Sequence, residues 1–232
     1  MGADDLAFAL SLADDADAIT LARFRAADLH VETKPDLTPV SEADRLVERT
    51  LRERIGRERP GEAVLGEEEG GGDASGWVID PIDGTRNYTR GIPIWATLIA
   101  FADRVAVVSA PALGRRWWAV RGAGAFAAPA LEPAVPIRVS GIDRIEDATL
   151  LYALDRPLPE RAWDAWHLRG FGDFWAHMLV AEGAAEVAVD ARGLAIWDTA
   201  AVAVIVEEAG GRFTEHVSSN GLLHDEALSV LR

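Results

Sequence analysis

The sequence contains no cysteine among its 232 residues. This absence excludes a disulfide framework, a thiol nucleophile and a zinc site built on thiolates. Long apolar runs are also missing, because none approaches the roughly 18 residues of a membrane-spanning helix. The first residues are acidic, whereas a secretory signal begins with basic ones. We therefore expect a cytoplasmic protein that does not act at a membrane.

Positive charge is scarce, and Lys34 is the only lysine. The 23 basic residues are outnumbered by 38 acidic ones, which gives a net charge of −15. This balance argues against nucleic-acid binding, which requires a basic face. If some of the acidic residues form a site for divalent cations, the bound ions invert the charge there. The acidic composition is then compatible with an anionic ligand.

Apolar periodicity, with glycine and proline between the periodic segments, predicts alternating helices and strands. A helix over 4–28 opens the chain, and a second helix begins after Ser41 as its N-cap. Further helices are expected at 173–184, at 197–209 and from 224, and strands at 77–80, 94–102, 105–110, 116–120, 149–152, 186–189 and 212–214. This order predicts a layered α/β domain with mixed sheets.

Two segments that join or end strands contain unusual residues for those positions. Pro81 has no backbone N–H to donate, so the strand 77–80 is predicted to end there. The segment 102–104 joins two strands but lacks the Asn-Gly or Asp-Gly pair that is usual in a tight hairpin.

Acidic residues gather in three separated segments: 67–68 after a short strand, 80–85 with the sequence DPIDGT, and Trp197-Asp198 at a helix start. Mg²⁺ prefers oxygen ligands. The turn at 80–85 allows two aspartates and the Ile82 carbonyl to converge on one point, and its glycine allows a ligand to approach the backbone closely. If a helix begins at 83–85, its free N–H groups favour a phosphate at the same point.

Each segment alone also has an ordinary structural interpretation. Asp83 and Asp198 could simply be helix N-caps, and residues 67–69 could form a solvated acidic loop. The three segments in this order and spacing form a far more specific pattern than any one of them.

Together, Gly66-Glu67-Glu68, the string DPIDGT and Trp197-Asp198 resemble the signature of the inositol monophosphatase-like family. The resemblance covers nearly the whole chain, including Lys34 and the segment 38–44. It implies an αβαβα sandwich like that of inositol monophosphatase and fructose-1,6-bisphosphatase, hydrolysis of a phosphate monoester, two or three Mg²⁺ ions and a homodimer. We divide the chain into an N-terminal α+β half, 1–136, which carries most metal-binding motifs, and a C-terminal α/β half, 137–232, which completes the site.

The resemblance also implies a set of metal ligands. Glu67 matches the glutamate that bridges toward a first and a third ion, and Asp80 matches the carboxylate that two ions share. Ile82 matches the residue that offers its carbonyl oxygen to a metal. Asp83 and Asp198 match ligands of a second ion.

Residues that act on water and phosphate follow from the same resemblance. Asp44 and Thr85 match the pair that orients the attacking water, and we count Glu67 with them as a catalytic residue. Gly84 and Thr85 match positions that donate backbone N–H groups to the phosphate. Lys34 matches a loop lysine of the family that can lie near the third ion, although it could also be a solvated loop residue.

Segments 80–100, 169–190 and 219–226 are similar to the histidinol-phosphatase branch, which implies histidinol phosphate as substrate and a place in histidine biosynthesis. Asp173, beside two aromatic residues, could form a wall of the substrate pocket, or it could cap a helix whose aromatic residues belong to the core. Where the family often has an acid shortly before the Trp-Asp pair, this chain has Asp190 and Arg192. Asp190 could replace that acid, whereas Arg192 would favour an anionic substrate.

Other functions compete with this one. Inositol-1-monophosphatase, or a broad sugar-phosphate phosphatase, would use the same metal ligands. A non-catalytic metal- or phosphate-binding protein would keep the fold without turnover, but all six residues whose loss would indicate that function are present: Asp44, Glu67, Asp80, Asp83, Thr85 and Asp198. A calcium site of the EF-hand type is disfavoured because the ligands come from distant segments.

Overall fold

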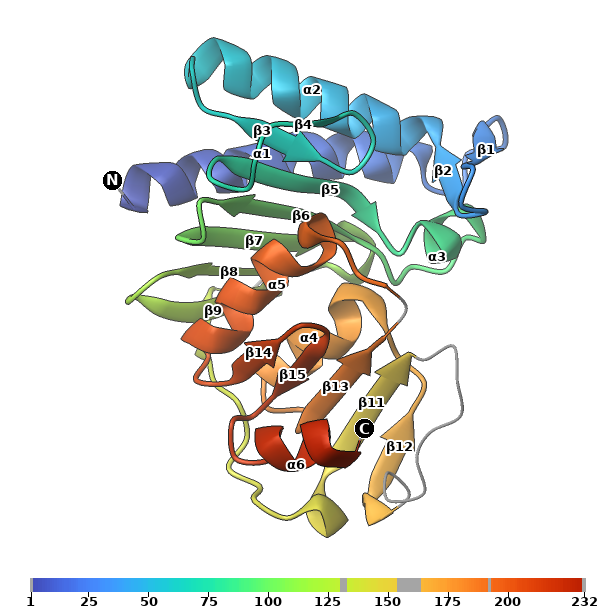
Figure 1. Ribbon diagram of the computed structural model, residues 1–232. Coiled ribbons are helices and arrows are strands. Elements are labelled where there is room, and N and C mark those ends of the chain that lie inside the picture. Colours follow the sequence, from blue (N-terminus) through green and yellow to red (C-terminus); the bar gives the residue numbers. More distant parts are fainter. Residues whose placement is uncertain (1, 130–132, 154–163, 192, 231–232) are drawn as a thin grey trace.

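The computed structural model describes residues 2–129, 133–153, 164–191 and 193–230. Its helices and sheets alternate in five layers, with a helix pair, an eight-stranded sheet, a second helix pair, a five-stranded sheet and a final helix (Figure 1). This arrangement is the αβαβα sandwich expected from the sequence. None of the helices in the described ranges is long and apolar enough to cross a membrane.

The first layer consists of α1 (Gly2–Arg23) and α2 (Glu42–Glu58), which pack on one face of the large sheet (Figure 1). Helix α1 ends five residues before its predicted end at 28, and Arg25 has a φ of 61° in the left-handed region that stops a helix. Helix α2 begins as predicted, because the Ser41 side chain accepts from Ala43 N–H and the Asp44 carboxylate accepts from Ser41 N–H.

The eight-stranded sheet has the order β10-β9-β8-β7-β6-β5-β3-β4. Its pairs are antiparallel except for the parallel pair of β3 and β5. The strands are β3 (Val64–Gly66), β4 (Gly70–Gly71), β5 (Trp77–Asp83), β6 (Ala96–Phe101), β7 (Val105–Ala110), β8 (Arg115–Val120), β9 (Gly124–Pro129) and β10 (Val135–Ile137). Helices cover both faces of β5, β6 and β7, so every residue of these strands is buried.

Strand β5 contradicts the prediction that Pro81 ends it. The strand continues to Asp83, with a bulge in its register against β6 between Asp80 and Asp83. A residue in a bulge is not paired with the neighbouring strand, so the missing N–H of Pro81 costs no hydrogen bond between the strands. The Pro81 carbonyl accepts a hydrogen bond of 2.8 Å from Thr97 Oγ1. Side chains three residues apart on a regular strand point to opposite faces, so the bulge is what lets Asp80 and Asp83 face the same site.

The remaining layers come from the second part of the chain. Helices α4 (Asp173–Ala181) and α5 (Ile196–Glu208) lie between the sheets, and α6 (His224–Val230) covers the outer face of the second sheet (Figure 1). That sheet has the order β12-β11-β13-β15-β14, formed by β11 (Thr149–Ala153), β12 (His167–Arg169), β13 (Val187–Asp190), β14 (Arg212–Thr214) and β15 (Val217–Ser219). The division of the chain at residue 136 stays a prediction.

Short elements complete the fold. A two-stranded hairpin of β1 (Val31–Thr33) and β2 (Pro39–Ser41) precedes α2, and α3 (Thr85–Thr89) directly follows β5. Residues Pro111–Leu113 and Ile145–Asp147 form 3₁₀ turns.

The β6–β7 connection, residues 102–104, contains a tight turn despite its unusual sequence. Ala102 and Asp103 have φ values of 48° and 54°, the positive values of a type I′ turn. The Arg104 N–H closes the turn on the Phe101 carbonyl at 2.9 Å. Alanine in this region is strained by about 1–2 kcal/mol, so the pairing of the flanking strands imposes the turn.

Candidate active site

A polar cleft of about 380 Å³ opens where the end of β5, the start of α5 and the β1–β2 hairpin meet. The segments that form it lie far apart in the sequence. Its lining residues are Asp36, Thr38, Pro39, Glu67, Asp80, Ile82, Asp83, Gly84, Thr85, Arg86, Asn87, Asp173, Gly193, Leu194, Ala195, Trp197 and Asp198.

Three of the predicted metal ligands converge at this cleft. Asp80, Asp83 and Asp198 each offer an oxygen atom, and these atoms lie within 4.8 Å of one another. Backbone N–H groups hold each carboxylate. Ile82 N–H donates to Asp80 Oδ1 at 3.0 Å, Phe174 N–H donates to Asp83 Oδ2, and Ala195 N–H donates to Asp198 Oδ2 at 2.6 Å.

The ordinary interpretations of two of these aspartates are now settled. Asp83 is not an N-cap, because Gly84 occupies that position of α3 and the Asp83 carboxylate accepts from the start of α4 instead. Asp198 is the third residue of α5, and its carboxylate accepts the N–H of the N-cap residue Ala195. It therefore stabilises the helix start and lines the cleft at the same time.

The crowding of buried carboxylates makes this site electrostatically unfavourable by itself. Burial raises the pKa of Asp80 well above its usual range, and the charges of Glu67 and Asp83 raise it further. Burial also raises the pKa of Asp83, with Asp173 and Asp198 adding to it, and raises the pKa of Asp198 to about 6. A divalent cation would neutralise these oxygen ligands, which repel one another in a buried site, so the three residues fit a hard divalent cation.

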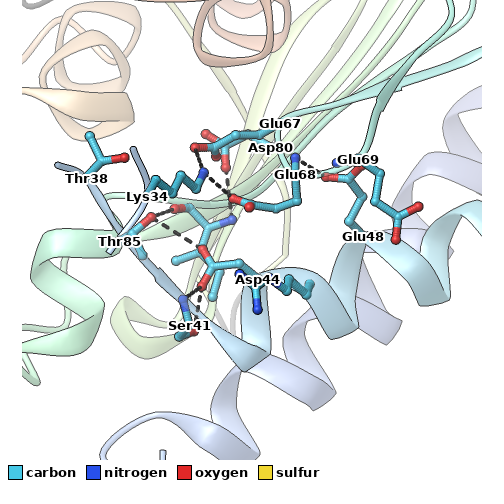
Figure 2. Close-up of polar contacts among 12 residues, drawn as sticks. Lys34, Thr38, Ser41, Asp44, Glu48, Glu67, Glu68, Glu69, Asp80 and Thr85 are labelled. Carbon is cyan, nitrogen blue, oxygen red and sulfur yellow. Dashed lines mark hydrogen bonds and ion pairs between the residues drawn. The ribbon is translucent and has the colours of Figure 1, made fainter. Parts of the chain in front are cut away.

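Glu67 and Glu68 follow β3 and meet Lys34 from the β1–β2 hairpin (Figure 2). Lys34 Nζ donates to Glu67 Oε1 at 2.8 Å and to Glu68 Oε1 at 2.5 Å. Burial alone would lower the pKa of Lys34, but the hydrogen bonds to both glutamates outweigh it and raise the pKa. Burial also raises the pKa of Glu68 to about 7, against the effect of Lys34. The Lys34 side chain is therefore held by two glutamates, one of which lines the cleft, and it is not a solvated loop residue.

Asp44 and Thr85, the predicted water-orienting pair, lie side by side (Figure 2). Thr85 Oγ1 donates to the Ile82 carbonyl at 2.9 Å and lies 3.4 Å from Asp44 Oδ1. The other Asp44 oxygen accepts from the N–H and hydroxyl of Ser41 at 2.8 and 2.5 Å. Burial raises the pKa of Asp44 to about 6, although the bonds from Ser41 oppose the shift.

Gly84 lines the cleft with its backbone in the left-handed region. Its φ is 86°, and a side-chain carbon there would lie 3.0 Å from the Ile94 carbonyl oxygen. Gly84 and Thr85 both line the cleft, as expected for backbone groups that contact a phosphate.

The substrate residues proposed from the sequence have different positions. Asp173 lines the cleft, but Asp190 is completely buried behind it and accepts the Asp173 N–H at 2.9 Å. Phe174 is in the hydrophobic core, as one of the two interpretations of this segment held, and Trp197 lines the cleft. Arg192 lies outside the described residues.

Sequence reasoning missed several cleft residues. Arg86 and Asn87 directly follow the DPIDGT string, so their place in the sequence was a usable signal. Asp36 and Thr38 come from the β1–β2 hairpin, and the sequence gives no local sign that its tip reaches the cleft.

The chain is similar to known proteins along its whole length. The model of the inositol monophosphatase family matches residues 3–228. A histidinol-phosphatase of Mycobacterium tuberculosis is 47% identical, over 100% of this chain and 99% of that protein. A histidinol-phosphatase of Streptomyces coelicolor is also 47% identical, over 98% and 97%. Among solved structures, Thermotoga maritima IMPase has a TM-score of 0.85 at 28% identity, over 98% of this chain and 96% of that one.

Proposed function

We propose that this chain, which belongs to the inositol monophosphatase family and is a phosphoric monoester hydrolase, hydrolyses L-histidinol phosphate to L-histidinol and phosphate with Mg²⁺. The observation that carries the choice of substrate is the 47% identity to two proteins named histidinol-phosphatase over nearly their full lengths. We include histidine biosynthesis, a cytoplasmic location and a homodimer in the proposal.

The donor set supports the metal part of the proposal. Asp80, Asp83 and Asp198 would hold the ions together with Glu67 and the carbonyl oxygen of Ile82. We propose two or three Mg²⁺ ions, which when bound lower the pKa of a water molecule and neutralise charge on the phosphoryl group.

Asp44 and Thr85 would orient the attacking water. The Thr85 hydroxyl has one hydrogen, which it can direct to Asp44 or to the Ile82 carbonyl. Its oxygen is then free to accept a hydrogen bond from a water molecule and to aim that water at phosphorus. As the new P–O bond forms, the attacking water gives up a proton, the P–O bond to the alcohol breaks and the leaving oxygen takes a proton, so the products are the alcohol and inorganic phosphate. Backbone N–H groups of Gly84 and Thr85 would bind the phosphoryl oxygens.

The cationic end of histidinol phosphate would face Asp173. This carboxylate lines the cleft near the metal ligands, and its charge contributes to the raised pKa of Asp83. An ammonium or imidazolium group beside Asp173 would reduce the repulsion between the Asp173 and Asp83 carboxylates. Trp197 also lines the cleft, and its aromatic ring could form a cation–π contact with the same group.

Phosphate release from a panel of esters tests the proposal: histidinol phosphate, inositol 1-phosphate, fructose 1,6-bisphosphate and adenosine 3′,5′-bisphosphate, with Mg²⁺ and with a chelator. We expect kcat/KM for histidinol phosphate to exceed the others about 100-fold, or about 2.7 kcal/mol of transition-state binding. A flat profile, or a preference for inositol 1-phosphate, would contradict the substrate. Turnover that resists the chelator would contradict the metal mechanism.

A further inference from the structure

The loop that carries Glu67 and Glu68 rests on α2. It leaves β3 at Gly66 and returns in β4 at Gly70–Gly71, and its glycines give it many alternative conformations in isolation. Beneath it, Glu48 projects from α2, one turn after Asp44 (Figure 2). The Glu48 side chain is completely buried, so its carboxylate needs partners inside the protein.

Those partners are the loop and one arginine. Glu48 Oε2 accepts the Glu68 N–H at 2.7 Å, and Oε1 accepts the Glu69 N–H at 3.0 Å. Arg52, one turn further along α2, donates from Nε to Glu48 Oε1 at 2.8 Å. The same guanidinium donates to the carbonyl oxygens of Val64 and Gly70. The pair thus binds four backbone groups, two within the loop and one near each end.

The loop backbone is shaped around this pair. A side-chain carbon on Gly66 would lie 2.2 Å from Glu48 Oε1, a distance that no side chain can occupy. A side-chain carbon on Gly71 would lie 3.1 Å from an Arg52 nitrogen and 2.5 Å from the Val64 carbonyl oxygen. Both glycines therefore allow the loop to lie directly on the buried ion pair.

Stability alone is a weak explanation for this pair. A buried ion pair costs desolvation energy that its attraction roughly offsets, and apolar residues of similar size often stabilise a protein equally well. The pair does one thing that apolar residues cannot do: it binds the N–H groups of Glu68 and Glu69. Lys34 binds the Glu67 carboxylate, so a divalent cation has to compete with Lys34 for that carboxylate.

We propose that Glu48, held by Arg52, is a positioning residue that fixes the loop backbone so that the Glu67 carboxylate stays directed at Asp80 and its metal. The proposal rests on the function proposed above, because it assigns Glu67 to the metal site. Without Glu48 the loop would adopt more conformations. Metal binding through Glu67 would then have to order the loop, and this cost lowers the affinity of the site for the metal ion.

The variant Glu48→Gln tests this role with little change of volume. A glutamine has one acceptor oxygen in place of two, so at least one loop N–H loses its partner. Glu186→Gln is the matched control, because Glu186 is also a buried glutamate that accepts a backbone N–H, from Thr149 at 2.6 Å, and it directly precedes β13, away from the loop. The measurements are Mn²⁺ affinity by titration calorimetry, amide hydrogen exchange of residues 64–72, and phosphate release.

We expect Glu48→Gln to weaken Mn²⁺ binding about 10- to 100-fold and to accelerate exchange at Glu68 and Glu69, while kcat at saturating metal falls less. The control should keep its Mn²⁺ affinity within about twofold. The proposal would be overturned if Glu48→Gln bound Mn²⁺ as tightly as the parent and lost only thermal stability, to the same extent as the control. If Glu48→Gln does not fold, Arg52→Lys keeps Glu48 but loses the arginine fork, and it should weaken Mn²⁺ binding in the same direction.

The experiment separates this proposal from the proposed function. A parent protein that binds Mn²⁺ but releases phosphate from no ester contradicts the function, and the comparison of Mn²⁺ affinities still decides the role of Glu48. Normal turnover in the parent, together with unchanged Mn²⁺ affinity in Glu48→Gln, contradicts the positioning role alone. A parent that binds no Mn²⁺ overturns both.

Discussion

Replacing Asp80 by asparagine should stabilise the metal-free protein while removing its response to metal. The carboxylate is buried, its oxygen lies within 4.8 Å of oxygens of two other aspartates, and burial with the neighbouring charges raises its pKa. Asparagine has the same shape and keeps an oxygen that can accept the Ile82 N–H. The substitution therefore removes one negative charge with little change in packing.

The size of the effect follows from the separation of the charges. At 4.8 Å and an effective dielectric constant of about 20, two unit charges repel by about 3 kcal/mol. Proton uptake by the three aspartates already relieves part of this repulsion. We therefore expect Asp80→Asn to raise the free energy of unfolding of the metal-free protein by about 1–3 kcal/mol at pH 8. For a chain of this length that gain corresponds to a rise in Tm of roughly 2–10 °C.

The sign of the pH dependence is fixed by the direction of the pKa shift. A carboxyl group whose pKa is raised on folding destabilises the folded state above its unfolded pKa, and this destabilisation grows until the pH passes the folded pKa. At pH 5 the folded protein already keeps much of the cluster protonated. The gain from Asp80→Asn should therefore be small at pH 5 and larger at pH 8.

Thermal unfolding at pH 5 and pH 8, with chelator and with Mg²⁺, measures these effects. Asp143→Asn is the control, because it removes the same charge from an exposed residue. The parent and the control should gain stability with Mg²⁺, whereas Asp80→Asn should gain little and lose most of its turnover. A metal-free Asp80→Asn protein that is less stable than the parent at pH 8, or that keeps the full Mg²⁺ response, would refute the reasoning.

Three further predictions test other parts of the structure. Thr85→Ala should lower kcat about 100-fold or more and leave Mn²⁺ affinity within about twofold, whereas Thr85→Ser should keep most activity; equal loss in both variants would contradict a role for the hydroxyl. The double substitution Ala102→Asn with Asp103→Gly should raise the free energy of unfolding in urea by about 1 kcal/mol, because asparagine and glycine adopt positive φ more easily than alanine and aspartate. A decrease would show that the turn is not strained. Asp173→Asn should raise KM for histidinol phosphate about tenfold without a similar change for inositol 1-phosphate, and equal changes would remove Asp173 from substrate discrimination.

Local structure was predictable where neighbouring residues decide it. The start of α2 follows from Ser41 and Asp44, which satisfy each other's backbone across one helical turn. Strands β7 and β14 have the predicted bounds, 105–110 and 212–214. The end of α1 and the course of the chain through Pro81 were predicted incorrectly, because a left-handed residue at 25 and a bulge against β6 override simple periodicity.

The candidate site was predictable as a set of residues, and its geometry was not. The motifs named Asp80, Asp83 and Asp198, but their convergence within 4.8 Å depends on a strand bulge and on the start of α5. The sequence also left Phe174 open as a pocket wall, whereas packing between the sheets places it in the core.

The sequence by itself determined the chemistry that is available: oxygen ligands without thiolates, a single lysine, and a glycine where the backbone must take a positive φ. Residue type and spacing are local properties, and they are enough to indicate a family and its reaction. Only the tertiary structure decided which side chains act together. It brought Glu48 and Arg52 to the backbone of the Glu67 loop and Lys34 to the Glu67 carboxylate, because such pairings depend on contacts between segments that no local pattern joins.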